Sequence, residues 1–131
     1  MKEFFGVPEM DLLRQSVRVD DPDAALTEAE SIIIQGQVSW PDLYDRADFH
    51  CIRPQLGSLL RKMPRGIVPE EVLSRLEEAN RQNLFQQLQN TGEFFAIKER
   101  LERAGITMVP FKGFWLAQEY YGDLAARESG D

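Results

Sequence analysis

Residues 69–105 read PEEVLSRLEEANRQNLFQQLQNTGEFFAIKERLERAG, and this stretch decides the fold class. Two glutamates follow Pro69 and basic residues gather near the other end, which is the charge order that stabilises a helix dipole. Gly92 leaves open whether the stretch forms one long helix or two, and Ala104-Gly105 is expected to end it. Apolar residues at helical spacing form its predicted inner stripe: Val72, Leu73, Leu76, Leu84, Leu88 and Phe95.

Shorter helices are predicted before this stretch, and prolines mark where they begin. Pro8 opens the first, Pro22 follows the capping residues Asp20-Asp21, and Pro41 lies in the first turn of the third. Pro54 must break or kink the chain after the third helix. The helices are expected near residues 8–17, 20–36, 40–51 and 56–64, with Leu43, Ala47 and Cys51 on one side of the third.

The pattern changes after Gly105. Residues 106–111 are short, apolar and β-branched, which predicts a strand, and a helix is expected again over 114–121. The fold class is therefore mostly α, with about five to six helices and one short terminal β-strand. A lone strand leaves its backbone donors and acceptors without a ladder, so residues 105–131 are expected to be an incomplete unit after a helical domain over 1–104.

The net charge of −7 lies in one segment. Residues 20–48 contain eight acidic residues and one base, Arg46, so the rest of the chain is neutral. A segment of this kind repels polyanions, which argues against broad nucleic-acid binding.

The only cysteine, Cys51, suits a reducing compartment, and no apolar run is long enough for a signal peptide or a bilayer span. We therefore expect a soluble, cytoplasmic protein without a membrane partner.

Three residue groups outside the C-terminal region are weaker candidates for a functional site. His50-Cys51 has no second His or Cys, so a zinc site or a Cys nucleophile is improbable, and a part-buried Cys beside a surface His is the plainer interpretation. Arg53, Arg61, Lys62 and Arg65 have no acid between them, which fits either an anion or RNA contact or, more often, a solvated rim. Aromatic residues including Phe94 and Phe95 are spaced like core residues.

A strand, a Lys112-Gly113 turn and a helix make a favourable arrangement for phosphate. Backbone N–H groups at a helix N-terminus point outward, and glycine lets an anion approach them closely. Lys112 adds a positive charge beside that position. Taken alone, a Lys-Gly pair before a helix is more often a structural turn.

In context this region resembles the uncharacterised nucleotidyltransferase family of the polymerase beta superfamily, known from bacterial proteins. The family has a strand ending in Lys-Gly, a helix with a Tyr near its end, an Arg, and then an Asp-x-Asp strand. The matching positions here are Lys112, Gly113, Tyr120 or Tyr121, Arg127 and Asp131. The resemblance covers about the last quarter of the chain sharply, and the long helix with Asn80, Arg81 and Asn83 more diffusely.

The resemblance implies Mg²⁺-dependent nucleotidyl transfer from a nucleoside triphosphate. It assigns triphosphate binding to Lys112 and Gly113, a phosphate contact to Arg127, and the first metal and catalytic carboxylate to Asp131. Residues 105–131 would then be the beginning of an α/β nucleotidyltransferase core.

Two departures qualify this expectation. The second carboxylate of the pair is not in the 131 residues, and Phe114 follows Gly113 where the superfamily usually has a Ser or a second Gly. One carboxylate does not hold a catalytic Mg²⁺ tightly, so the chain is expected to be an inactive amino-terminal fragment. The alternative is a helical protein–protein interaction module without catalysis. In either case the unpaired strand predicts a homo-oligomer.

Overall fold

The computed structural model describes residues 6–110 together with Glu119, Gly122 and Glu128. Within these residues the chain forms five α-helices and no strand, so the predicted mostly α fold class is confirmed. The helices are α1 (Pro8–Ser16), α2 (Pro22–Ile34), α3 (Trp40–Phe49), α4 (Arg53–Arg61) and α5 (Glu70–Arg103).

Proline starts the first four helices, as predicted for three of them. Each of α1 to α4 carries a proline in its first two positions, where the missing N–H would have had no partner within the helix. At α2 the carboxylate of Asp21 also accepts a hydrogen bond from the backbone N–H of Ala24, at 3.0 Å. Pro54 does not only interrupt the chain, as predicted, but begins α4.

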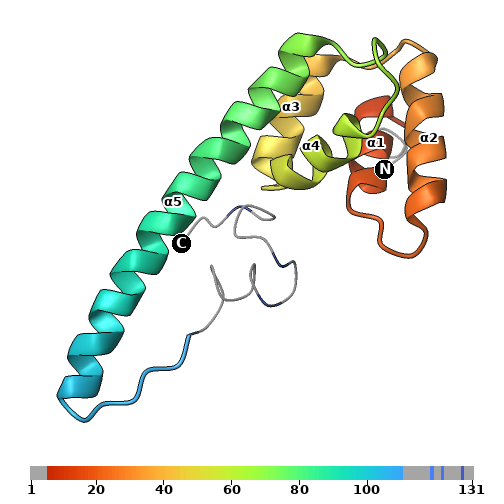
Figure 1. The fold of residues 1–131 in the computed structure, drawn as a ribbon. Coiled ribbons are helices and arrows are strands. Elements are labelled where there is room, and N and C mark those ends of the chain that lie inside the picture. Colours follow the sequence, from red (N-terminus) through yellow and green to blue (C-terminus); the bar gives the residue numbers. More distant parts are fainter. Residues whose placement is uncertain (1–5, 111–118, 120–121, 123–127, 129–131) are drawn as a thin grey trace.

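The four short helices form a compact bundle, with α1 in contact with α2, α3 and α4 (Figure 1). Its centre is aliphatic, because each helix turns one apolar side inward. A polar contact joins α1 to α3 beside it: the buried carboxylate of Glu9 accepts a hydrogen bond from the N–H of Ser39, the residue that caps α3, at 2.7 Å. The fully buried large residues of the bundle are Leu12, Leu43, Leu56 and Leu60.

The long stretch is one continuous helix, which settles the alternative left open at Gly92. The first turns of α5 pack against α4, where Leu76 lies against Gly57, and the rest of α5 extends beyond the bundle (Figure 1). The predicted inner stripe is therefore buried only at its start. Leu84, Leu88 and Phe95 are exposed, and Phe85 and Ile97 are exposed beside them.

Three sequence expectations are wrong in the described residues. Residues 106–110 form no strand, since no described segment lies alongside to supply a hydrogen-bond ladder. Cys51 lies beyond the end of α3, with φ of +57°, and is exposed rather than part-buried on the inner side of that helix. Phe95 is exposed rather than a core residue, since α5 has left the bundle at that point. The expected helix over 114–121 lies almost entirely outside the described residues.

Candidate functional site

The residues with predicted nucleotidyltransferase roles lie outside the described part of the structure. These are Lys112, Gly113, Arg127 and Asp131, together with the two tyrosines at 120 and 121. Glu128, in contrast, is described, and it follows Arg127 directly and precedes Asp131 by three residues. The surroundings of Glu128 therefore show which part of the helical bundle lies next to this residue.

Glu128 forms an ion pair with Arg53, the first residue of α4. The Nε–H group of Arg53 donates to the Oε1 atom of Glu128, across 75 positions of sequence. The side chains are only 25% and 11% exposed, so the pair is largely shielded from water. Shielded, charge-assisted hydrogen bonds are stronger than surface ion pairs, and this one links the C-terminal region to the start of α4.

Two residues of α3 hold the other side of Arg53. A terminal N–H of its guanidinium donates to the hydroxyl of Tyr44, at 3.2 Å, and the Oδ1 atom of Asp48 lies 3.4 Å from its Nε. Partial burial lowers the pKa of Arg53, but its hydrogen bonds to Glu128 and Tyr44 and the charge of Glu128 outweigh this, so its pKa is raised. Arg53 therefore carries its positive charge at every working pH.

Tyr44 also connects this ion pair to α5. The guanidinium carbon of Arg75 lies 3.7 Å from the centre of the Tyr44 ring, which is a close cation–π contact. Tyr44 and Arg75 line an open pocket of about 320 Å³ with Trp40 and Val72 among others. The ring of Tyr44 is thus fixed by α5, and its hydroxyl can orient Arg53.

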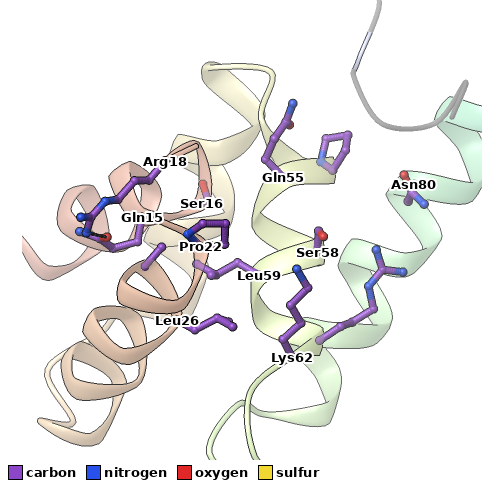
Figure 2. A pocket seen from close by; sticks show the side chains of 13 residues that line it. Gln15, Ser16, Arg18, Pro22, Leu26, Gln55, Ser58, Leu59, Lys62 and Asn80 are labelled. Carbon is purple, nitrogen blue, oxygen red and sulfur yellow. Dashed lines mark hydrogen bonds between the residues drawn. The ribbon is translucent and has the colours of Figure 1, made fainter. Parts of the chain in front are cut away.

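A second pocket, of about 280 Å³, lies between α4, the two N-terminal helices and α5 (Figure 2). We call it the basic pocket, because three of its lining residues are cationic and none is acidic. Its floor is the side of α4 that carries Ser58, Leu59 and Lys62, with Leu26 and Pro22 opposite. The complete lining is Gln15, Ser16, Arg18, Pro22, Ala25, Leu26, Pro54, Gln55, Ser58, Leu59, Arg61, Lys62 and Asn80.

The three cations of the basic pocket differ in their partners. Arg18 is already neutralised by Asp20, with two contacts of 2.7 and 3.3 Å, and it also reaches Gln15. The hydrogen bond from Arg18 lowers the pKa of Asp20, which keeps that carboxylate ionised. Arg61 donates its Nε–H to the carbonyl oxygen of Gly57 at 3.2 Å, and neither Arg61 nor Lys62 faces a carboxylate within 4.0 Å among the described residues.

Gln55 lines this pocket and carries a buried polar atom. Its side-chain carbonyl oxygen is shielded from solvent and accepts no hydrogen bond from the described residues. Gln55 lies two residues after Arg53, so the first turn of α4 holds the ion pair with Glu128 and also contributes to the basic pocket.

A metal site finds no support in the part of the chain that the structure describes. No group of three or more His, Cys, Asp or Glu side chains is close enough together there to hold an ion. His50 caps the C-terminal end of α3, and Cys51 is exposed directly after it. In the same residues, no helix is both long and apolar enough to cross a membrane.

In the sequence, four bases follow one another without an acid between them: Arg53, Arg61, Lys62 and Arg65. The structure separates them: Arg53 faces α3 and Glu128, whereas Arg61 and Lys62 line the basic pocket and Arg65 lies in the following turn. Arg18 and Asn80 also line that pocket; no motif marks Arg18, and Asn80 was singled out only within the diffuse resemblance of the long helix. Such contacts depend on how the helices pack, which the local pattern does not encode.

Comparison with protein families identifies one match. The family described as uncharacterised nucleotidyltransferase matches residues 36–131, which include α3, α4, α5 and the whole C-terminal region. No curated protein and no solved structure matches the chain.

Proposed function

The chain belongs to the uncharacterised nucleotidyltransferase family, and on this basis we propose that it serves in Mg²⁺-dependent transfer of a nucleotidyl group from a nucleoside triphosphate. The observation that carries the proposal is the extent of the family match, which covers most of the chain and every residue given a role below. The exposed Cys51 fits a cytoplasmic setting, where a thiol stays reduced.

The proposed roles follow the resemblance. Lys112 and Gly113 bind the triphosphate, Lys112 with its ammonium charge and Gly113 by allowing close approach of the backbone. Arg127 contacts a phosphate oxygen through its forked guanidinium. Asp131 is the first carboxylate ligand of Mg²⁺, an ion that would polarise the α-phosphate and offset the charge of the departing pyrophosphate.

The helical bundle contributes position rather than chemistry in this proposal. Arg53 binds Glu128, and three residues of chain span at most about 11 Å, so Asp131 must lie within that reach of Glu128. The preceding residue, Arg127, is bonded directly to it. Arg53 is thus a positioning residue, whose partner is the residue between the proposed phosphate contact and the proposed metal ligand.

Among the described residues, no group of three or more acidic, His or Cys side chains is close enough together to hold an ion by itself. A single carboxylate holds Mg²⁺ weakly, since tight sites combine several oxygen ligands. We therefore propose that these 131 residues bind a nucleoside triphosphate mainly through Lys112 and Arg127, with little turnover of their own.

The test is a calorimetric titration of the whole chain with each of the four ribonucleoside triphosphates, with and without Mg²⁺. Lys112→Ala and Arg127→Ala should each weaken binding about tenfold or more, as expected when a charged partner of phosphate is lost. Arg81→Ala is the charge-matched control, because Arg81 is exposed on α5 and contacts only Glu78 among the described residues. Equal affinity in all four proteins would reject the assigned roles.

One observation favours the second candidate, a helical interaction module. The part of α5 beyond the bundle exposes several large apolar residues on one helix, and apolar surface of this kind marks protein–protein contacts. The same surface, rather than a strand at 106–110, gives a reason to expect a homo-oligomer. The module gains support if no triphosphate binds, or if Lys112→Ala and Arg127→Ala leave nucleotide binding unchanged.

A further inference from the structure

We propose that the basic pocket binds a small phosphate ester that also carries a hydroxyl or amine donor, such as a sugar phosphate or a nucleoside monophosphate. Its lining residues in the described part of the chain are other than the proposed triphosphate contacts Lys112 and Arg127. Its occupancy does not depend on nucleotidyl transfer.

Charge is the first argument. The chain has a net charge of −7, yet no acidic residue lines this pocket. Arg18 is neutralised by Asp20, which leaves Arg61 and Lys62 as two positive charges without a carboxylate beside them in the described residues. An isolated pair of cations in an acidic protein attracts an anion to this position.

The geometry of the two cations is the second argument. Arg61 is tied through its Nε–H to the carbonyl oxygen of Gly57, which fixes the guanidinium and leaves its terminal N–H groups for a ligand. Lys62 and Ser58 lie four residues apart, about one helical turn, and both line the pocket (Figure 2). The guanidinium of Arg61, the ammonium of Lys62 and the hydroxyl of Ser58 can each donate hydrogen bonds to phosphate oxygens.

The third argument is the side-chain amide of Asn80, which lines the pocket from α5 (Figure 2). An amide both donates and accepts hydrogen bonds, so it can pair with a hydroxyl or amine of the ligand as well as with phosphate.

Size limits the ligand to a small molecule. At about 280 Å³ the pocket is slightly smaller than the usual range of small-molecule sites, which begins at about 300 Å³. It is open to solvent, and the acidic residues 20–48 border it through α2. These features favour one phosphate ester over an RNA strand, which would need an extended basic track.

The test uses the whole chain and calorimetry with four probes: ribose 5-phosphate, AMP, inorganic phosphate and ribose. We expect both esters to bind, inorganic phosphate to bind more weakly, and ribose not to bind. Tighter binding of AMP identifies the ligand as a nucleotide, and equal binding of the two esters identifies a sugar phosphate.

Three variants locate the site. Arg61→Gln and Lys62→Ala should each weaken ester binding about tenfold, and both side chains are exposed, so the fold should persist. Asn80→Ala should weaken the esters more than inorganic phosphate, because the amide can pair with the hydroxyls of the ester. Arg65→Ala, a nearby base that does not line the pocket, is the matched control. Ester affinity unchanged in Arg61→Gln and Lys62→Ala, no ester binding at all, or a preference for single-stranded RNA would overturn the proposal.

Discussion

Arg53 and Glu128 lie 75 residues apart in the sequence and form a largely shielded ion pair. The pair connects the first turn of α4 to Glu128, the first of the three residues between Arg127 and Asp131. Because Tyr44 and Asp48 of α3 hold the same guanidinium, the contact rests on two helices of the bundle. Glu128, close in sequence to the proposed phosphate contact and metal ligand, is therefore bound to the helical bundle at a defined place.

The Arg53–Glu128 pair should show measurable coupling. Arg53→Ala leaves the carboxylate of Glu128 shielded without a donor, so it should lower the free energy of unfolding by about 1–3 kcal/mol. Glu128→Gln should cost less, because Tyr44 and Asp48 still face Arg53. A double-mutant cycle by urea denaturation should give a coupling energy above that of exposed pairs, which is about 0.2–1 kcal/mol. A coupling energy near zero would mean that the two side chains do not interact in solution.

The stabilisation by Arg53 should not depend on pH across the neutral range. A group whose pKa is raised on folding stabilises the fold at every pH below its unfolded pKa, and this stabilisation is lost only as the pH rises through the folded value. For arginine, the pH at which this stabilisation is lost lies above the range of pH that is usually studied. The difference in unfolding free energy between wild type and Arg53→Ala should thus be constant from about pH 6 to about pH 9. A penalty that vanishes by the alkaline end would contradict the pKa direction.

Two glycines should respond to alanine with opposite signs. Gly92 lies inside α5 with nothing within 4 Å of an added Cβ, so Gly92→Ala should stabilise the protein by about 0.5–1 kcal/mol. Gly36 ends α2 at φ +74°, where an L-residue is strained, so Gly36→Ala should destabilise by about 1 kcal/mol. Thermal unfolding of the two variants provides the comparison. Destabilisation by Gly92→Ala would indicate that α5 is not continuous there.

The bundle core should be sensitive to truncation at α3. Leu43 is fully buried, so Leu43→Ala should cost about 2–5 kcal/mol through lost burial and a residual cavity. Val19, between α1 and α2, is 90% exposed, and Val19→Ala should change stability by no more than about 0.5 kcal/mol. Denaturant unfolding of both variants tests this arrangement. A loss at Val19 comparable to that at Leu43 would show that the core is placed wrongly.

The features of this fold that could be predicted from the sequence are those that depend on neighbouring residues along the chain. The prolines at helix starts, the capping Asp21 and the charges at the ends of α5 act within a few residues, so the helices and their starts followed from sequence. The failures involve partners in three dimensions. A strand at 106–110 needs a neighbour that the described residues do not provide, and Phe95 has an inward spacing on a helix that has left its bundle.

The candidate site residues likewise fall into two groups, those that a sequence motif predicts and those that only helix packing brings together. The Lys112-Gly113 turn and Asp131 came from a linear motif, and the family match includes them. The contact of Arg53 with Glu128 and the grouping of Arg61, Lys62 and Asn80 depend on helix packing. Neither follows from spacing along the chain, since the bases of residues 53–65 look alike in the sequence.

The most direct test of the proposed function is hydrogen exchange of the whole chain, followed residue by residue with and without a saturating nucleoside triphosphate. Nucleotide binding through Lys112, Gly113 and Arg127 predicts added protection concentrated in residues 105–131, and its loss in Lys112→Ala. Protection that is absent, or confined to the exposed apolar side of α5, would contradict the account and favour an interaction module.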